Sequence, residues 1–183
     1  DWSSDVCSSD LPSARSFADR WILSRVNRAI EQVTAALEHY RFDQAASHLY
    51  HFIWHEYCDW YLELIKPALQ KESDEARRMR HTLVESFDAT LRLLHPFMPY
   101  LTEEIWQKMP HEGESIMRQP FPASRPDWDA KDAETQFEVL SRFVSTARLG
   151  RSLLNISPAQ RVTLYGTSRS EEHTSELQSP DHL

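Results

Sequence analysis

The chain has 183 residues, with 20 basic and 28 acidic side chains and a formal net charge of −8. Its three glycines leave no phosphate-binding glycine loop, so a P-loop or a dinucleotide-binding fingerprint is excluded. No apolar run approaches the ~20 residues of a membrane span, and we expect a soluble, cytoplasmic, mostly helical protein.

The two ends of the chain differ in character from the rest. Residues 1–11 (DWSSDVCSSDL) and 169–183 (beginning RSEEHTSELQ) are rich in serine and acidic residues and show no helical or strand period. One DNA sequence encodes the first segment, its reverse complement encodes RSEEHTSELQ, and it looks like a sequencing-library adapter. We therefore predict that both ends are translated, non-native sequence and exclude them from the fold.

This exclusion changes the charge argument. Without the one basic and seven acidic residues of the two ends, 19 basic and 21 acidic side chains are left, a net charge of −2. Bulk charge then neither favours nor excludes a nucleic-acid partner, and only local patches are informative.

The first predicted helix begins after Ser16. Ser16 and Asp19 have the spacing of a capping box. Apolar residues then recur at helical spacing: Ile22, Val26, Ile30, Val33, Leu37 and Tyr40. The link 40–42 is so short that this helix and the next should lie antiparallel.

The chain is predicted to be organised around a second helix over residues 42–67. Asp43 is expected to cap its N-terminus, and Pro67 is expected to stop or kink it. Between them a single apolar stripe is predicted to face the core, made of Ala46, Leu49, Tyr50, Ile53, Tyr57, Trp60, Tyr61 and Leu64.

Three further helices complete the prediction. A charged loop leads into a third helix that carries Met79 to Leu94 and ends before Pro96. Thr102 is expected to cap a short fourth helix. Residues 109–127 are expected to form a loop or irregular arm, with SIMRQPF extended, and a fifth helix follows from about 132 to 154.

The predicted fold is all-α, an antiparallel helical bundle over residues 12–155. Residues 156–168 are expected to start the following connection, with a short strand at Val162–Tyr165.

Candidate chemical sites are weak. His48, His51 and His55 could present three imidazoles on one helix face, but they lack the HExxH order and a cysteine partner, so a solvated polar face is favoured over a metal site. Cys58 has no basic neighbour and is expected to be a buried thiol rather than a nucleophile. We therefore predict no catalytic residue and no metal site.

The basic residues are more suggestive. Arg20, Arg25 and Arg28 cluster on the first helix, and Arg41 lies beside Phe42 at the helix junction. Arginine on phosphates and an aromatic ring for stacking is how splayed RNA bases are held. The alternative is a salt-bridged solvent face for the arginines and a core role for Phe42, and composition alone favours this alternative.

Three segments change that balance: residues 18–30 (ADRWILSRVNRAI), 40–67 (YRFDQAASHLYHFIWHEYCDWYLELIKP) and 81–107 (HTLVESFDATLRLLHPFMPYLTEEIWQ). Together they resemble the anticodon-binding helical domain of valyl-tRNA synthetases, and the resemblance covers most of residues 18–165. CDWYLELIKP and HPFMPYLTEEIWQ are its most specific parts. The same domain of an isoleucyl- or leucyl-tRNA synthetase, a non-RNA helical interaction scaffold and a metal-dependent helical enzyme stay open as alternatives.

The resemblance implies a module of a class I synthetase that joins valine to its tRNA using ATP and magnesium. This sequence holds no HIGH-like or KMSKS-like signature, no editing domain, and no coiled-coil arm after Tyr165. We therefore expect a fragment without enzymatic activity or a cofactor of its own, whose partners are the valine tRNA and the rest of the synthetase. Arg20, Arg25, Arg41 and Phe42 are the predicted tRNA contacts, and the last two are the better pair because a helix junction can present both to a loop.

Overall fold

The computed structural model describes residues 15–157, 160 and 163. Within this part the chain is helical and contains no strand, so the all-α prediction is confirmed. Both predicted non-native ends, and the Val162–Tyr165 strand apart from residue 163, lie outside the described residues. The chain divides into two compact units, Asp1–Glu138 and Val139–Leu183.

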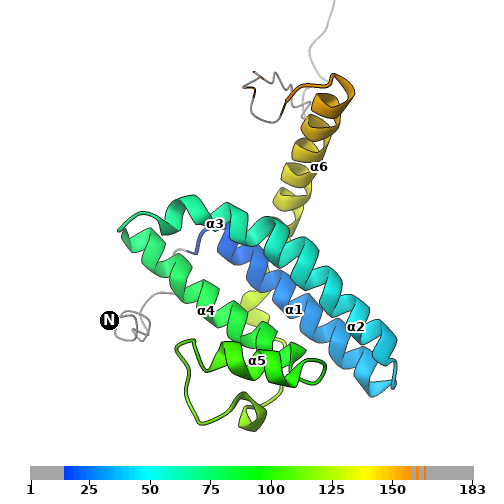
Figure 1. The fold of residues 1–183 in the computed structure, drawn as a ribbon, viewed down its shortest axis with the longest axis vertical. Coiled ribbons are helices and arrows are strands. Elements are labelled where there is room, and N and C mark those ends of the chain that lie inside the picture. The colour runs from blue at the N-terminus through cyan, green and yellow to red at the C-terminus, as the bar shows by residue number, and fades with distance from the viewer. Residues whose placement is uncertain (1–14, 158–159, 161–162, 164–183) are drawn as a thin grey trace, which may run out of the picture. The chain divides into compact units, whose positions relative to one another are not determined.

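The first unit is a bundle in which α1 (Phe17–Glu38) is the central helix (Figure 1). It packs against the continuous run of α2 (Phe42–His51), the π-helix η2 (Phe52–Tyr61) and α3 (Leu62–Leu69). It also packs against α4 (Asp74–Leu94), which in turn contacts α3 and α5 (Pro99–Trp106). The core is therefore centred on α1 rather than on the 42–67 segment alone.

The capping box at the start of α1 is confirmed. Ser16 Oγ accepts a hydrogen bond from the Asp19 amide at 3.2 Å, and the Ser16 amide donates to Asp19 Oδ2 at 3.2 Å. Asp19 is fully buried, and the Tyr61 hydroxyl donates to its other oxygen at 3.3 Å. Burial raises the pKa of Asp19, although its hydrogen bonds with Ser16 oppose the shift. The cap thus also joins α1 to the π-helix.

We expect Asp19→Asn to remove a pH-dependent loss of stability. Because the pKa of Asp19 is raised in the folded chain above its ordinary value of about 4, the folded state binds this proton more tightly than the unfolded state does. The extra stability that protonated Asp19 gives the folded chain is fully present below about pH 4. It is lost as the pH rises through the pKa that Asp19 has in the folded state. Urea unfolding between pH 4 and 7 should show the stability difference, wild type minus D19N, falling with pH. A difference that rises with pH would contradict this.

The run from α2 to α3 begins and ends differently from the prediction. Arg41, not Asp43, is the N-cap residue, and its carbonyl accepts the first helical hydrogen bond, from the Ala45 amide at 3.0 Å. The predicted Asp43 cap is wrong because the preceding turn already places Arg41 at the helix boundary, which leaves Asp43 in the first turn. Pro67 lies inside α3, which continues to Leu69, so the proline does not stop the helix at once.

The π-helix corrects the predicted apolar stripe. The buried residues of the run are Ala45, Leu49, Phe52, Tyr57, Tyr61 and Ile65. The step of five between Phe52 and Tyr57 matches the i→i+5 hydrogen bonding of a π-helix, whereas the prediction assumed 3.6 residues per turn throughout. Leu49, Tyr57 and Tyr61 are confirmed as core residues, while Ala46 and Tyr50 are exposed.

The second half of the bundle contains two further corrections. Ser73 caps α4 by accepting from the Ala76 amide at 3.2 Å. Thr102 does not cap α5; it lies within the helix, where its hydroxyl donates to the Met98 carbonyl at 2.9 Å, and Met98 holds the cap position. The SIMRQPF segment is not extended, because Ile116–Arg118 forms the 3₁₀ turn η3.

After the short 3₁₀ turn η4 (Pro126–Trp128), α6 runs over Lys131–Leu153, close to the predicted 132–154. Its first residues, up to Glu138, belong to the first unit, where Phe137 stacks on Trp21 with ring centroids 3.7 Å apart. Among the described residues, no helix has both the length and the apolar character needed to cross a membrane.

Candidate nucleic-acid interface

The junction between α1 and α2 is a tight turn. The Tyr40 amide donates to the Leu37 carbonyl at 3.0 Å, and the Arg41 amide donates to the Ala36 carbonyl at 2.8 Å. These two bonds are the 5→2 and 6→1 pair of a Schellman motif, which ends a helix with one residue in the left-handed conformation. Tyr40 is that residue, with φ of 57°. The motif reverses the chain direction within three residues and places α2 alongside α1.

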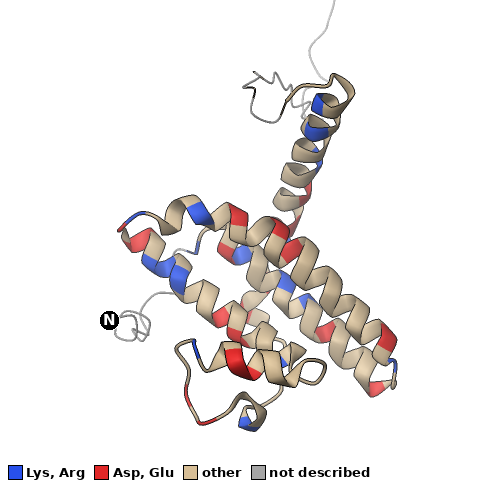
Figure 2. Cartoon of the chain, viewed as in Figure 1, with Lys and Arg blue, Asp and Glu red and all other residues tan. Residues whose placement is uncertain are grey.

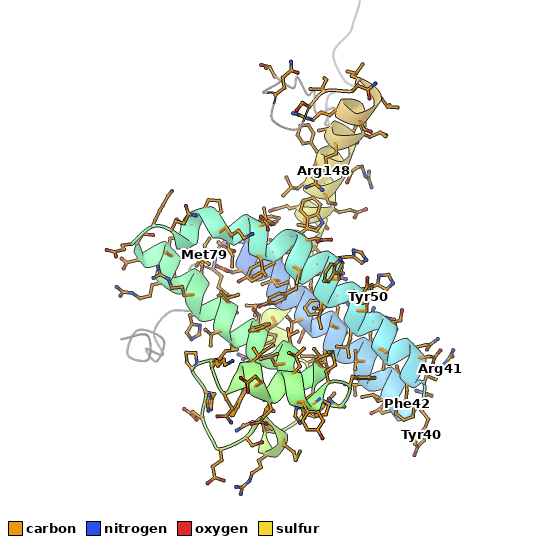
Figure 3. The ribbon with its side chains drawn as sticks, viewed as in Figure 1. Tyr40, Arg41, Phe42, Tyr50, Met79 and Arg148 are labelled. Atoms are coloured by element: carbon orange, nitrogen blue, oxygen red, sulfur yellow. The ribbon has the colours of Figure 1, made fainter. Side chains whose placement is uncertain are left out.

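The side chains of this junction point away from the bundle (Figure 3). Tyr40 is 82% exposed and Phe42 is 58% exposed, and their rings meet edge to face with centroids 6.5 Å apart. Arg41 is exposed as well, and within the described part of the chain its guanidinium forms no ion pair or hydrogen bond. The junction therefore offers a cation that is unpaired within the described residues and is next in sequence to two exposed aromatic rings, and Phe42 does not have the core role of the alternative.

The other predicted contact arginines occupy a different place. Arg20 forms an ion pair with Asp132 at 2.6 Å. Arg25 donates two hydrogen bonds to the Glu56 carboxylate, at 2.6 and 2.9 Å. Arg25 also lies 3.7 Å from Glu134. The hydrogen bonds to Glu56 raise the pKa of the Arg25 guanidinium, which therefore stays charged.

These ion pairs join α1 to the π-helix and to the start of α6. Arg25 lies 13 residues before the end of α1 at Glu38, which is ~20 Å along the helix at 1.5 Å per residue, so the structure does not bring the α1 arginines together with the junction. Basic and acidic residues are interspersed along α1, whereas the α2–α3 run carries four acidic residues followed by one lysine, Lys66 (Figure 2). The tRNA contact predicted for Arg20 and Arg25 stays untested, and their ion pairs within the bundle favour the alternative of a salt-bridged face.

The histidine face does not assemble a metal-ligand group. The rings of His51 and His55 lie 5.4 Å apart, and His55 Nδ1 lies 3.5 Å from an Asp59 carboxylate oxygen. Within residues 15–157, no cluster of three histidine, cysteine or acidic side chains could hold a metal ion. Cys58 is half-buried rather than buried, and desolvation together with the Asp59 charge raises its thiol pKa. Neither feature provides a reactive centre.

One exposed aromatic pair was missed by the sequence analysis. Tyr50 and Trp54 are 59% and 55% exposed, and their rings are parallel within 4° with centroids 6.5 Å apart. The edges of His51 and His55 surround Tyr50. The predicted apolar stripe placed Tyr50 in the core, whereas the buried positions of α2 are Ala45 and Leu49, which leaves Tyr50 on the exposed side of the helix.

Comparison with known proteins identifies the family of this chain. Residues 19–165 match the family model described as the anticodon-binding domain of tRNA ligase. A valine–tRNA ligase from Bacillus subtilis is 42% identical over 171 residues, which cover 93% of this chain and 19% of that protein. Those of Carboxydothermus hydrogenoformans and Thermotoga maritima are 44% and 46% identical, over 86% and 80% of this chain and 18% and 17% of their own length.

The chain thus spans about a fifth of the length of these relatives. The match covers the whole of the described bundle except its first few residues, including the α1–α2 junction and α6. The chain belongs to the anticodon-binding domain family of tRNA ligases.

Proposed function

We propose that this chain is the tRNA-binding part of a valine–tRNA ligase, and that the α1–α2 junction contacts the anticodon loop of a valine tRNA. The observation that carries the proposal is the exposed guanidinium of Arg41, which has no partner among residues 15–157, next in sequence to the exposed ring of Phe42. The cation supplies a phosphate contact and the ring supplies a stacking surface for an unpaired base.

The parent protein, on this proposal, works in the cytoplasm and attaches valine to its tRNA with ATP and magnesium. The support is the identity to valine–tRNA ligases, which is at least 42% in the three relatives compared. The domain alone would bind and position the tRNA, and the support for this role is the match to the anticodon-binding domain family. Isoleucyl- and leucyl-tRNA ligases are the competing parents, and a comparison of tRNAs separates them.

We expect Arg41→Glu to weaken binding of valine tRNA to the 183-residue chain by about tenfold, because a phosphate contact becomes a repulsion. The affinity should also depend less steeply on salt, since each lost phosphate contact lowers the counterion-release slope by about one. The measurement is fluorescence anisotropy with valine, isoleucine and leucine tRNA transcripts at two salt concentrations.

Lys66→Glu is the matched control. It makes the same charge change on the same helical run, on a side chain that is 60% exposed and pairs with Glu63 in α3. It lies 24 residues along that run from the start of α2. Equal losses for the two variants would mean that only net charge matters, and an affinity independent of salt would favour an interaction scaffold over an RNA-binding domain.

A further inference from the structure

We propose that Tyr40 is a base-stacking residue of this interface, a role that rests on the proposed function. Its ring and the ring of Phe42 would together form a corner for one unpaired base of the anticodon loop. The inference comes from the conformation of Tyr40 and from the surroundings of its side chain.

Tyr40 occupies a backbone position that suits glycine. Its φ is 57°, in the left-handed region where a Cβ atom crowds the backbone and where glycine meets no such penalty. The same position in a Schellman motif is most often glycine. A tyrosine here therefore lowers the stability of the turn relative to glycine.

The Tyr40 ring contributes little to the stability of the fold. The side chain is 82% exposed, and its aromatic contact is the edge-to-face approach to Phe42, itself 58% exposed. Within the described residues the Tyr40 hydroxyl makes no hydrogen bond. A strained backbone whose cost is not offset by side-chain packing indicates a functional position. Here the strained residue, Tyr40, is next to Arg41 in the chain.

The ring geometry indicates what the site would take. The planes of Tyr40 and Phe42 are inclined at 73°, with centroids 6.5 Å apart. Such rings cannot sandwich a base between parallel faces. They form a corner, in which a base stacks flat on one ring and meets the other ring with its edge. The free hydroxyl of Tyr40 can donate to or accept from a base edge, and the guanidinium of Arg41 is adjacent for the phosphate.

The test compares Tyr40→Gly, Tyr40→Phe and Tyr100→Ala in the 183-residue chain, with a valine tRNA transcript as the probe. Y40G relieves the backbone and removes the ring, so its melting temperature should equal or exceed that of the wild type. Its Kd should rise about five- to tenfold, the loss expected for one base–aromatic stack. Y40F keeps the ring and should bind within about twofold of the wild type.

Tyr100 is the control because its ring is 91% exposed and belongs to α5, which does not form the junction. Y100A should bind as the wild type does, and an equal loss for Y100A and Y40G would overturn the role of Tyr40. Wild-type affinity in Y40G, while R41E binds weakly, would overturn this inference and leave the proposed function standing. No binding by the wild type, or full binding by R41E, would overturn both.

Discussion

Replacing Trp21 by alanine is expected to lower the free energy of unfolding by about 3–5 kcal/mol, the range for a large aromatic side chain removed from a packed core. Trp21 is 2% exposed on α1 and stacks on Phe137 of α6 at 3.7 Å with planes 17° apart. Trp60 of the π-helix meets the same Phe137 ring edge to face at 5.1 Å. Three segments that are distant in sequence thus meet at one aromatic cluster, and the variant leaves a cavity at their common contact.

Trp54→Ala is the control for this prediction. It deletes the same side chain from the same bundle, but Trp54 is 55% exposed and contacts mainly Tyr50, so the loss should stay below about 1 kcal/mol. Urea unfolding followed by far-ultraviolet circular dichroism measures both. Similar losses for W21A and W54A would show that the cluster is not the centre of the core.

Helix positions followed from the sequence where local chemistry decides them. The start of α1 was predicted because the two hydrogen bonds of the capping box join Ser16 and Asp19, which are only three residues apart in the sequence. The second helix start failed at Asp43, because the Schellman turn before it, rather than the best capping side chain, sets the boundary. A turn with tyrosine at the glycine position carries no sequence signal of its own.

The candidate site was predictable in part for the same reason. Arg41 and Phe42 are neighbours in the chain, so a short helix junction was enough to bring them together. The partners of Arg20 and Arg25 could not be read from the sequence, since Asp132 is 112 residues from the first and Glu134 approaches only when α6 packs on α1. Long-range ion pairs depend on tertiary packing that a helical period does not contain.

Arg25→Glu is therefore expected to act on stability and not on RNA binding. The substitution would bring three carboxylates together around a side chain that is 28% exposed, beside Glu56 and Glu134 at 26% and 22%. The variant loses the half-buried guanidinium that donates two hydrogen bonds to Glu56, and it adds repulsion between like charges. Together these changes should lower the free energy of unfolding by about 2–4 kcal/mol. The affinity of the folded variant for valine tRNA should stay within about twofold of the wild type.

Arg20→Glu is the matched control on the same helix. Its ion pair with Asp132 is more exposed, at 39% and 57%, and screening by solvent should make its destabilisation clearly smaller than that of R25E. Unfolding and tRNA binding measured on R20E, R25E and R41E would then separate two kinds of arginine. R25E should lose stability and keep its affinity, whereas R41E should keep its stability and lose affinity. Weak tRNA binding by a folded R25E would return the α1 arginines to the interface, because their ion pairs would then have to open or be shared when the RNA binds.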